Sequence, residues 1–199
     1  MVVQPRPDRT HMSVEEYLAL DRSSVDAKYE YIDGQVYLLA GGSFNHSTIS
    51  SNVLSLLRSR LRGSSCHACN SDVRVRISAS KYVLPDVSVS CHPSDQGTGD
   101  IMEYPRLVVE VLSPSTRGYD RWKKSILYRT VPTMEECVLV DAEQHFVEVY
   151  RHAQNKHWVI VSFGPGEQVE LASLGVSFPI EAIYEDVIFP QDRADESPV

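Results

Sequence analysis

Two acidic residues stand in or beside apolar runs that are expected to form strands. Glu110 interrupts LVVEVL at residues 107–112, and Asp86 follows Pro85 in VLPDVSVS at residues 83–90. An ionised carboxylate is costly to bury unless it is paired, bound to a metal or placed at the edge of a cleft. Carboxylates on neighbouring strands can converge on Mg²⁺, which prefers oxygen ligands and keeps several of its waters. Such an ion would activate water or polarise a phosphoryl oxygen.

A basic residue is spaced so that it could join these acids. Asp120, Lys124 and Tyr128 recur every four residues in a predicted helix, so they share one face of it. If that face turns toward the strands, Lys124 could orient an attacking water or offset charge developing on a phosphate. The alternative is an exposed ion pair between Asp120 and Lys124, which would contribute little to stability.

Other residues near these motifs have two interpretations each. Glu30 lies before a predicted hairpin turn, and it is either a third acid of the site or a surface acid beside the turn. His46, at a predicted helix start, either joins the site or contacts its own backbone. Tyr128 fits core packing better than catalysis. Ser113, Ser115 and Thr116 fit turn and cap positions, because no G-x-S-x-G sequence surrounds them.

The elements that must position these residues follow from capping signals, turn signals and hydrophobic spacing. Ser13 and Glu16 form a capping box that begins a helix ending near Leu20. Asp33-Gly34 predicts a hairpin within residues 28–40. Helices are also predicted over 45–61 and 119–130, and strands over 71–78, 83–90, 107–112, 136–141, 145–151, 157–163 and 167–171. This order predicts an α+β fold with a mixed sheet flanked by helices.

Basic residues are concentrated in two segments of an acidic chain. The formal net charge of −8 weighs against a protein that coats nucleic acid, but a local basic face can coexist with an acidic surface. Residues 58–81 and 117–129 contain most of these cations: Arg58, Arg60, Arg62, Arg74, Arg76 and Lys81 in the first, and Arg117, Arg121, Lys123, Lys124 and Arg129 in the second. Arg74 and Arg76 alternate with apolar residues, which predicts a half-exposed strand. Charge alone leaves open whether these are nucleic-acid contacts or solvated faces.

The composition is that of one globular domain. Of 199 residues, 42% are hydrophobic and 23% charged, and no stretch of 18 apolar residues predicts a membrane span. The domain is expected at residues 13–189, with flexible ends at 1–12 and 190–199. The first residues do not resemble a signal peptide, so a cytoplasmic location is expected and the four cysteines are interpreted as thiols. A zinc site at Cys66-His67-Ala68-Cys69 and a nucleotide cofactor are both disfavoured.

Six of these segments occur together in a specific order. They are YEYIDGQV (29–36), Asn45-His46, LPDVSV (84–89), LVVEVLSPST (107–116), D-x-x-x-K-x-x-x-Y (120–128) and VPTMEECVLVD (131–141). In this order the chain resembles the large bacterial family described as "putative restriction endonucleases", within the PD-(D/E)XK nuclease superfamily. The resemblance covers residues 13 to about 187. The series of motifs is specific, whereas Pro-Asp alone would not be.

The resemblance implies a restriction-endonuclease-like fold and a DNA endonuclease that depends on a divalent metal. It implies that Asp86, Glu110 and the carbonyl of Val111 hold Mg²⁺ or Mn²⁺, and that Glu30 completes the acidic cluster. One position departs from the superfamily pattern, because Leu112 stands where E-x-K would place lysine. The lysine is then expected on the following helix at Lys124, with Lys123 as the second choice.

Partners also follow from this resemblance. The expected partner is DNA, with backbone contacts from the arginines of residues 58–76 and 117–121, among them Arg74, Arg76, Arg117 and Arg121. A homodimer is expected by analogy with enzymes of this fold. His46, Lys123 and Tyr128 are accessory candidates. The main alternative is a nuclease-fold protein that no longer cuts and acts as a binding or regulatory partner. A weaker alternative is a metal-dependent hydrolase of small phosphate esters.

Overall fold

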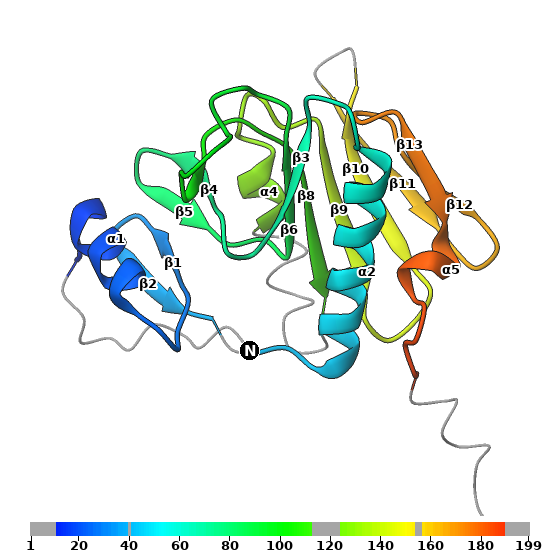
Figure 1. Ribbon diagram of the computed structural model, residues 1–199, viewed down its shortest axis with the longest axis horizontal. Coiled ribbons are helices and arrows are strands. Elements are labelled where there is room, and N and C mark those ends of the chain that lie inside the picture. The colour runs from blue at the N-terminus through cyan, green and yellow to red at the C-terminus, as the bar shows by residue number, and fades with distance from the viewer. Residues whose placement is uncertain (1–10, 40, 113–123, 154–156, 190–199) are drawn as a thin grey trace, which may run out of the picture.

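Two mixed β-sheets and a separate hairpin form the frame of this computed structural model, which describes residues 11–39, 41–112, 124–153 and 157–189 (Figure 1). One sheet contains, in spatial order, β2 (Gln35–Leu38), β1 (Tyr29–Ile32), β5 (Lys81–Val83), β4 (Arg74–Ser78) and β7 (Ile101–Met102). The second contains β11 (Trp158–Phe163), β10 (Val147–His152), β9 (Glu136–Asp141), β8 (Pro105–Leu112), β6 (Val87–Ser90) and β3 (His67–Asn70). The hairpin is β12 (Gln168–Leu171) and β13 (Val176–Pro179). The helices are α1 (Val14–Ser23), α2 (Phe44–Arg60), α4 (Ser125–Tyr128) and α5 (Ile180–Ile183).

The N-terminal elements form where capping and turn signals predict them. The Ser13 N–H donates to Glu16 Oε2 at 2.7 Å and the Glu16 N–H donates to Ser13 Oγ at 3.2 Å, which confirms the capping box. Asp33 and Gly34 have φ angles of 49° and 89°, the backbone of a type I′ hairpin turn. The Met12 N–H donates to the Gly34 carbonyl at 3.0 Å, so this residue of the expected N-terminal segment is bonded to the hairpin turn. The other expected flexible positions, except residue 11, lie outside the described residues.

Pro85 and Asp86 break the strand that was predicted over residues 83–90. The chain leaves the five-stranded sheet after Val83 and enters the six-stranded sheet at Val87. A proline has no N–H to donate to a strand ladder, so pairing cannot continue through Pro85. Asp86 therefore lies at the crossing between the two sheets, not within a strand.

β8 is the central strand that its apolar sequence predicts, and both of its faces are covered. Leu107, Val109 and Val111 belong to the core that α2 completes through Ile49, Val53 and Leu57, as the helical spacing predicts. Val108 and Leu112 point the other way, into a second core that includes Tyr128 of α4. Figure 1 shows α2 crossing one face of this sheet. No helix among the described residues is long and apolar enough to cross a membrane.

Arg74 is buried, which corrects the expectation that β4 exposes it. Its Nε donates to Asp21 Oδ2 at 2.6 Å and its guanidinium contacts Asp100 Oδ2 at 2.8 Å. Asp21 also accepts from the Tyr29 N–H at 3.0 Å, so it connects α1 with β1 and β4. Both acids are distant from Arg74 in the sequence, and for that reason strand alternation could not predict this ion pair.

We expect Asp21→Ala to lower the free energy of unfolding by about 3 kcal/mol, because it leaves a buried guanidinium without its main partner. Urea denaturation would measure the change. Glu103→Ala is the matched control, since it removes an acid from the exposed ion pair with Arg76 on the same strand, where the N–O distance is 3.0 Å. That control should cost less than about 1 kcal/mol. Equal losses in the two variants would contradict a structural role for the buried pair.

The cysteines are not all thiols, because Cys66 and Cys91 form a disulfide. His67 of β3 pairs with Ser90 of β6 in antiparallel register. Cys66, which precedes His67, therefore lies opposite Cys91, which follows Ser90. This antiparallel register brings together two cysteines separated by 25 positions. Cys69 and Cys137 remain thiols. The disulfide removes Cys66 from the zinc-type C-x-x-C alternative.

Candidate active site

Glu110 points to the face of β8 that α4 covers. Side chains alternate along a strand, so Glu110 shares this face with Val108 and Leu112. Its side chain is almost fully buried, and the hydroxyl of Tyr128 donates to Oε1. The ammonium of Lys124 lies 3.2 Å from the same oxygen. Lys124 and Tyr128 therefore present one helical face to Glu110, as their four-residue spacing predicts.

Glu30 reaches the same lysine from the other sheet. Its Oε1 lies 3.0 Å from Lys124 Nζ and accepts from the Leu84 N–H at 3.1 Å. Glu30 is only 2% exposed, and Glu110 and Lys124 are 5% and 7% exposed. Charges at this depth are costly unless they are paired and hydrogen-bonded. Lys124 thus joins two buried carboxylates that belong to two different sheets.

Asp86 lies beside Val111, the residue that follows Glu110 in β8. Its Oδ2 accepts from the Val111 N–H at 2.7 Å, and among the described residues none donates to its Oδ1. Val87 is paired with Val109, so Asp86 approaches β8 just beyond the end of β6. The N–H and C=O of one residue in an extended strand face the same neighbour. The Val111 carbonyl therefore faces the side on which Asp86 lies.

His46 brings the start of α2 to this site. Ser43 caps the helix, accepting from the His46 N–H at 3.2 Å, and the His46 Nε2 lies 3.3 Å from Asp86 Oδ2. The two side chains are 23% and 17% exposed, so this part of the site is open to solvent. The contact favours the interpretation of His46 as a member of the site over a contact with its own backbone alone.

Burial sets the protonation of two groups around Glu110. Burial raises the pKa of Tyr128 well above its ordinary value, and the nearby Glu110 and Glu30 carboxylates raise it further. The phenol therefore stays protonated at neutral pH and can donate to Glu110. Burial likewise raises the pKa of the Cys137 thiol, which disfavours a nucleophilic thiolate at this position.

The donors of the site fit a hard divalent cation. Asp86, Glu110 and the Val111 carbonyl offer only oxygen, and Mg²⁺ is often bound by one or two carboxylates with several waters retained. Among the described residues, no group of three His, Cys, Asp or Glu side chains is placed to hold a metal ion. An ion held by these donors would take its remaining ligands from water.

The structure assembles some of the predicted residues and separates others. Four side chains are in contact with one another: Glu30, Glu110, Lys124 and Tyr128. His46 and Asp86 form a second contact, which the Val111 N–H joins to β8 beside Glu110. Arg76 is half-exposed and paired with Glu103, and Arg74 is internal. Arg117, Arg121 and Lys123 lie outside the described residues. The Leu84 N–H that donates to Glu30 was not predicted, although the Leu-Pro-Asp break in the strand was a signal for it.

Comparisons with known proteins show the family and the fold of this chain. A profile of the Uma2 family, described as "Putative restriction endonuclease", matches residues 14–181. Two proteins of Synechocystis sp., both described as uncharacterized, are similar: slr1290 is 39% identical over 89% of this chain and 94% of its own, and sll1609 is 31% identical over 80% and 91%. A crystal structure titled as a putative nuclease belonging to DUF820 from Anabaena variabilis matches with a TM-score of 0.71, at 21% identity, over 89% of this chain and 99% of the other. That likeness confirms the predicted α+β, restriction-endonuclease-like fold.

Proposed function

Because this chain belongs to the Uma2 family, we propose that it is an endonuclease that hydrolyses phosphodiester bonds in DNA. In this proposal, Asp86, Glu110 and the carbonyl of Val111 hold Mg²⁺ or Mn²⁺. One observation supports it above all others: the Lys124 ammonium lies 3.0 and 3.2 Å from the Glu30 and Glu110 carboxylates, next to the residue whose N–H binds Asp86. Acids and a lysine at one point provide the groups that metal-assisted hydrolysis of a phosphodiester requires.

Each residue of the site has a defined task in this mechanism. The bound cation would supply Lewis-acid polarisation of the scissile phosphate. Lys124 would orient the attacking water and offset negative charge that develops at phosphorus. Tyr128 fixes one oxygen of Glu110, and the Val111 N–H with His46 fixes one oxygen of Asp86, so that both carboxylates are oriented before substrate binds.

A cleavage assay with a matched variant tests the proposal. Wild type should cut supercoiled plasmid or single-stranded DNA in Mg²⁺ or Mn²⁺ but not in EDTA. Asp86→Asn should cut at least about 100-fold more slowly, because even residues that only orient metal ligands typically contribute 10- to 100-fold. The control Asp72→Asn changes an exposed acid paired with Lys28 and should cut like wild type.

Two results would count against the proposal. Cutting by Asp86→Asn at the wild-type rate would assign the activity to another site or to a contaminant. Binding of DNA by wild type without cutting, under every metal condition and with several sequences, would favour the nuclease-fold binding protein instead. We also propose a homodimer, by analogy with enzymes of this fold that pair to cut both strands of a duplex.

A further inference from the structure

Three arginines near the end of α2 have no partner within the described part of the chain. Arg58, Arg60 and Arg62 are exposed, and no hydrogen bond or ion pair from a described residue reaches them. Arginines elsewhere in that part of the chain contact a carboxylate, or, for Arg129, a carbonyl and the Tyr150 ring. In a chain with a net charge of −8, three neighbouring cations without a carboxylate are unusual.

The sequence around these arginines lacks acidic residues. Residues 34–71, which include β2, α2 and β3, contain no aspartate or glutamate. Cations at a helix C-terminus do interact favourably with the helix dipole, which accounts for a basic last turn. The dipole does not explain why acids are absent along the whole length of α2, including its first turn, where they would be stabilising. Binding of a polyanion along the helix explains both features.

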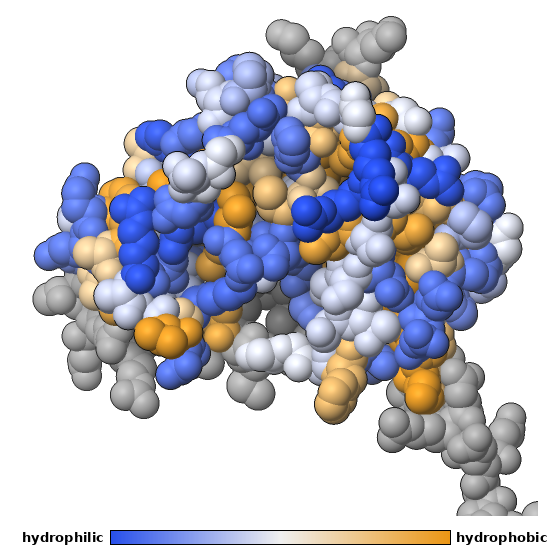
Figure 2. Space-filling model, viewed as in Figure 1, coloured by the Kyte–Doolittle hydropathy of each residue, from blue (hydrophilic) through white to orange (hydrophobic). Residues whose placement is uncertain are grey.

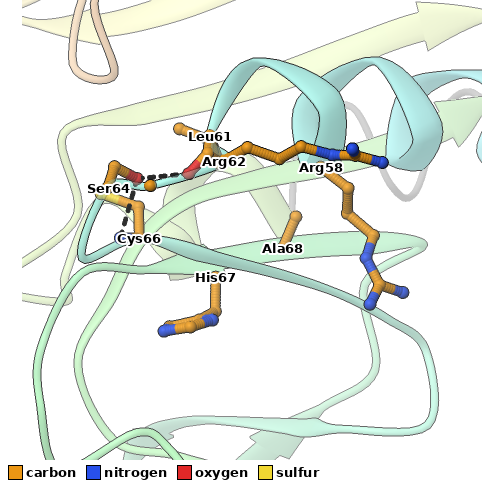
Figure 3. Close-up of a pocket in the computed structure, with 8 residues that line it drawn as sticks. Arg58, Leu61, Arg62, Ser64, Cys66, His67 and Ala68 are labelled. Carbon is orange, nitrogen blue, oxygen red and sulfur yellow. Dashed lines mark hydrogen bonds between the residues drawn. The ribbon is translucent and has the colours of Figure 1, made fainter.

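The exposed side of α2 is hollowed where the arginines lie. A depression of about 460 Å³ is lined by Ser51, Leu54, Ser55, Arg58, Ser59 and Arg62. In Figure 2, strongly hydrophilic side chains gather over the C-terminal end of α2. Figure 3, which views a neighbouring pocket of about 330 Å³, shows the side chains of Arg58 and Arg62 extending away from their own backbone without an interaction with the other residues drawn. Hydroxyls and guanidinium groups are typical phosphate-binding groups.

The direction of α2 connects this surface with the candidate active site. His46, in its first turn, contacts Asp86. At a rise of 1.5 Å per residue, Arg58 lies about 18 Å farther along the helix axis. That length corresponds to about five base pairs of B-form DNA at 3.4 Å each.

We propose that the exposed face of α2 binds the phosphate backbone of duplex DNA, with Arg58 and Arg62 as its main contacts. The proposal rests on the proposed function for the identity of the polyanion. It assigns the phosphate contacts to arginines without a partner among the described residues. Arg74 is not one of them, because its guanidinium is paired with Asp21 inside the protein.

Binding in EDTA tests this surface without any cleavage. The anisotropy of a labelled 30-base-pair duplex would be measured with wild type and Arg58→Ala/Arg62→Ala over a range of salt concentrations. Each phosphate contact contributes about −0.9 to the slope of log K against log salt, so the variant should lose about 1.8 from that slope and bind at least about tenfold more weakly at low salt. Arg58→Lys/Arg62→Lys should retain the slope because it retains the charges.

A second double variant separates position from net charge. Arg22→Ala/Arg106→Ala removes two exposed arginines that are paired with Asp100 and Glu135, and should bind DNA within about twofold of wild type. An unchanged slope in Arg58→Ala/Arg62→Ala, an equal loss in the control, or no duplex binding by wild type at low salt would each overturn the inference. If wild type binds DNA through α2 but never cuts it, the proposed nuclease activity is refuted and the inference about α2 stands. If wild type cuts DNA but the salt slope of Arg58→Ala/Arg62→Ala is unchanged, the inference is refuted and the nuclease activity stands.

Discussion

Lys124→Met is expected to lower the free energy of unfolding by about 3–5 kcal/mol and to abolish DNA cleavage. The ammonium is the group that lies between Glu30 and Glu110, both of which are nearly excluded from water. Methionine keeps the length and apolar stem of lysine and removes the charge, so two buried carboxylates lose their shared cation. Removing one member of a buried ion pair typically costs this much, because the remaining charges stay desolvated.

Urea denaturation and the plasmid assay would measure both effects. Lys28→Met is the matched control, since its ammonium is 2.7 Å from Asp72 but 46% of the side chain is exposed, and it should cost less than about 1 kcal/mol. The double variant Glu30→Gln/Lys124→Met should be less destabilised than the sum of its two single variants, because the two groups interact. Additive losses, or a loss no greater than that of Lys28→Met, would show that Lys124 does not hold the two acids together.

Glu110→Gln is expected to abolish metal binding as well as cleavage. The amide keeps the shape of the side chain and can still accept from Tyr128, but it is neutral and a much weaker ligand for a hard cation. Calorimetric titration with Mn²⁺ in the absence of DNA should show an affinity at least about 100-fold below that of wild type. This readout does not depend on whether the DNA offered contains a cleavable sequence.

Glu136→Gln provides the control for burial. Glu136 is a fully buried glutamate on the neighbouring strand β9, where it accepts from Arg151 and from the Ser173 backbone. The change should lower stability but leave the affinity for Mn²⁺ unchanged. Equal loss of metal binding in both variants would point to a general effect on folding, and unchanged binding in Glu110→Gln would exclude this glutamate as a ligand.

Local signals in the sequence predicted the elements that depend on local chemistry. The capping box at Ser13, the turn at Asp33-Gly34 and the apolar face of α2 all require only neighbouring residues, and each forms as expected. The contact of Lys124 with Glu110 combines helix periodicity with strand alternation, and it was predicted on the condition that the helix faces the strands. The hydrogen bond from Tyr128 to Glu110 was not predicted, because Tyr128 was expected to pack in the core.

The predictions that were wrong concern features that depend on contacts between segments distant in the sequence. Arg74 alternates with apolar residues like any solvent-facing residue, and only the approach of α1 explains its burial. The disulfide between Cys66 and Cys91 depends on the register of β3 against β6. The Pro85 break was visible in the sequence, but its consequence, a change of sheet, follows from which strands find partners on each side.

Because Lys124 lies between Glu30 and Glu110, the candidate site can assemble only after Lys124 has been translated. Glu30 is translated well before Lys124, which stands 94 positions later in the sequence. Contacts over such sequence separations slow folding, because loop-closure entropy must be paid before they form. A nascent chain therefore contains the acids but not the assembled site. On the proposed function, such a nascent chain cannot yet cleave DNA, because Lys124 has not been translated.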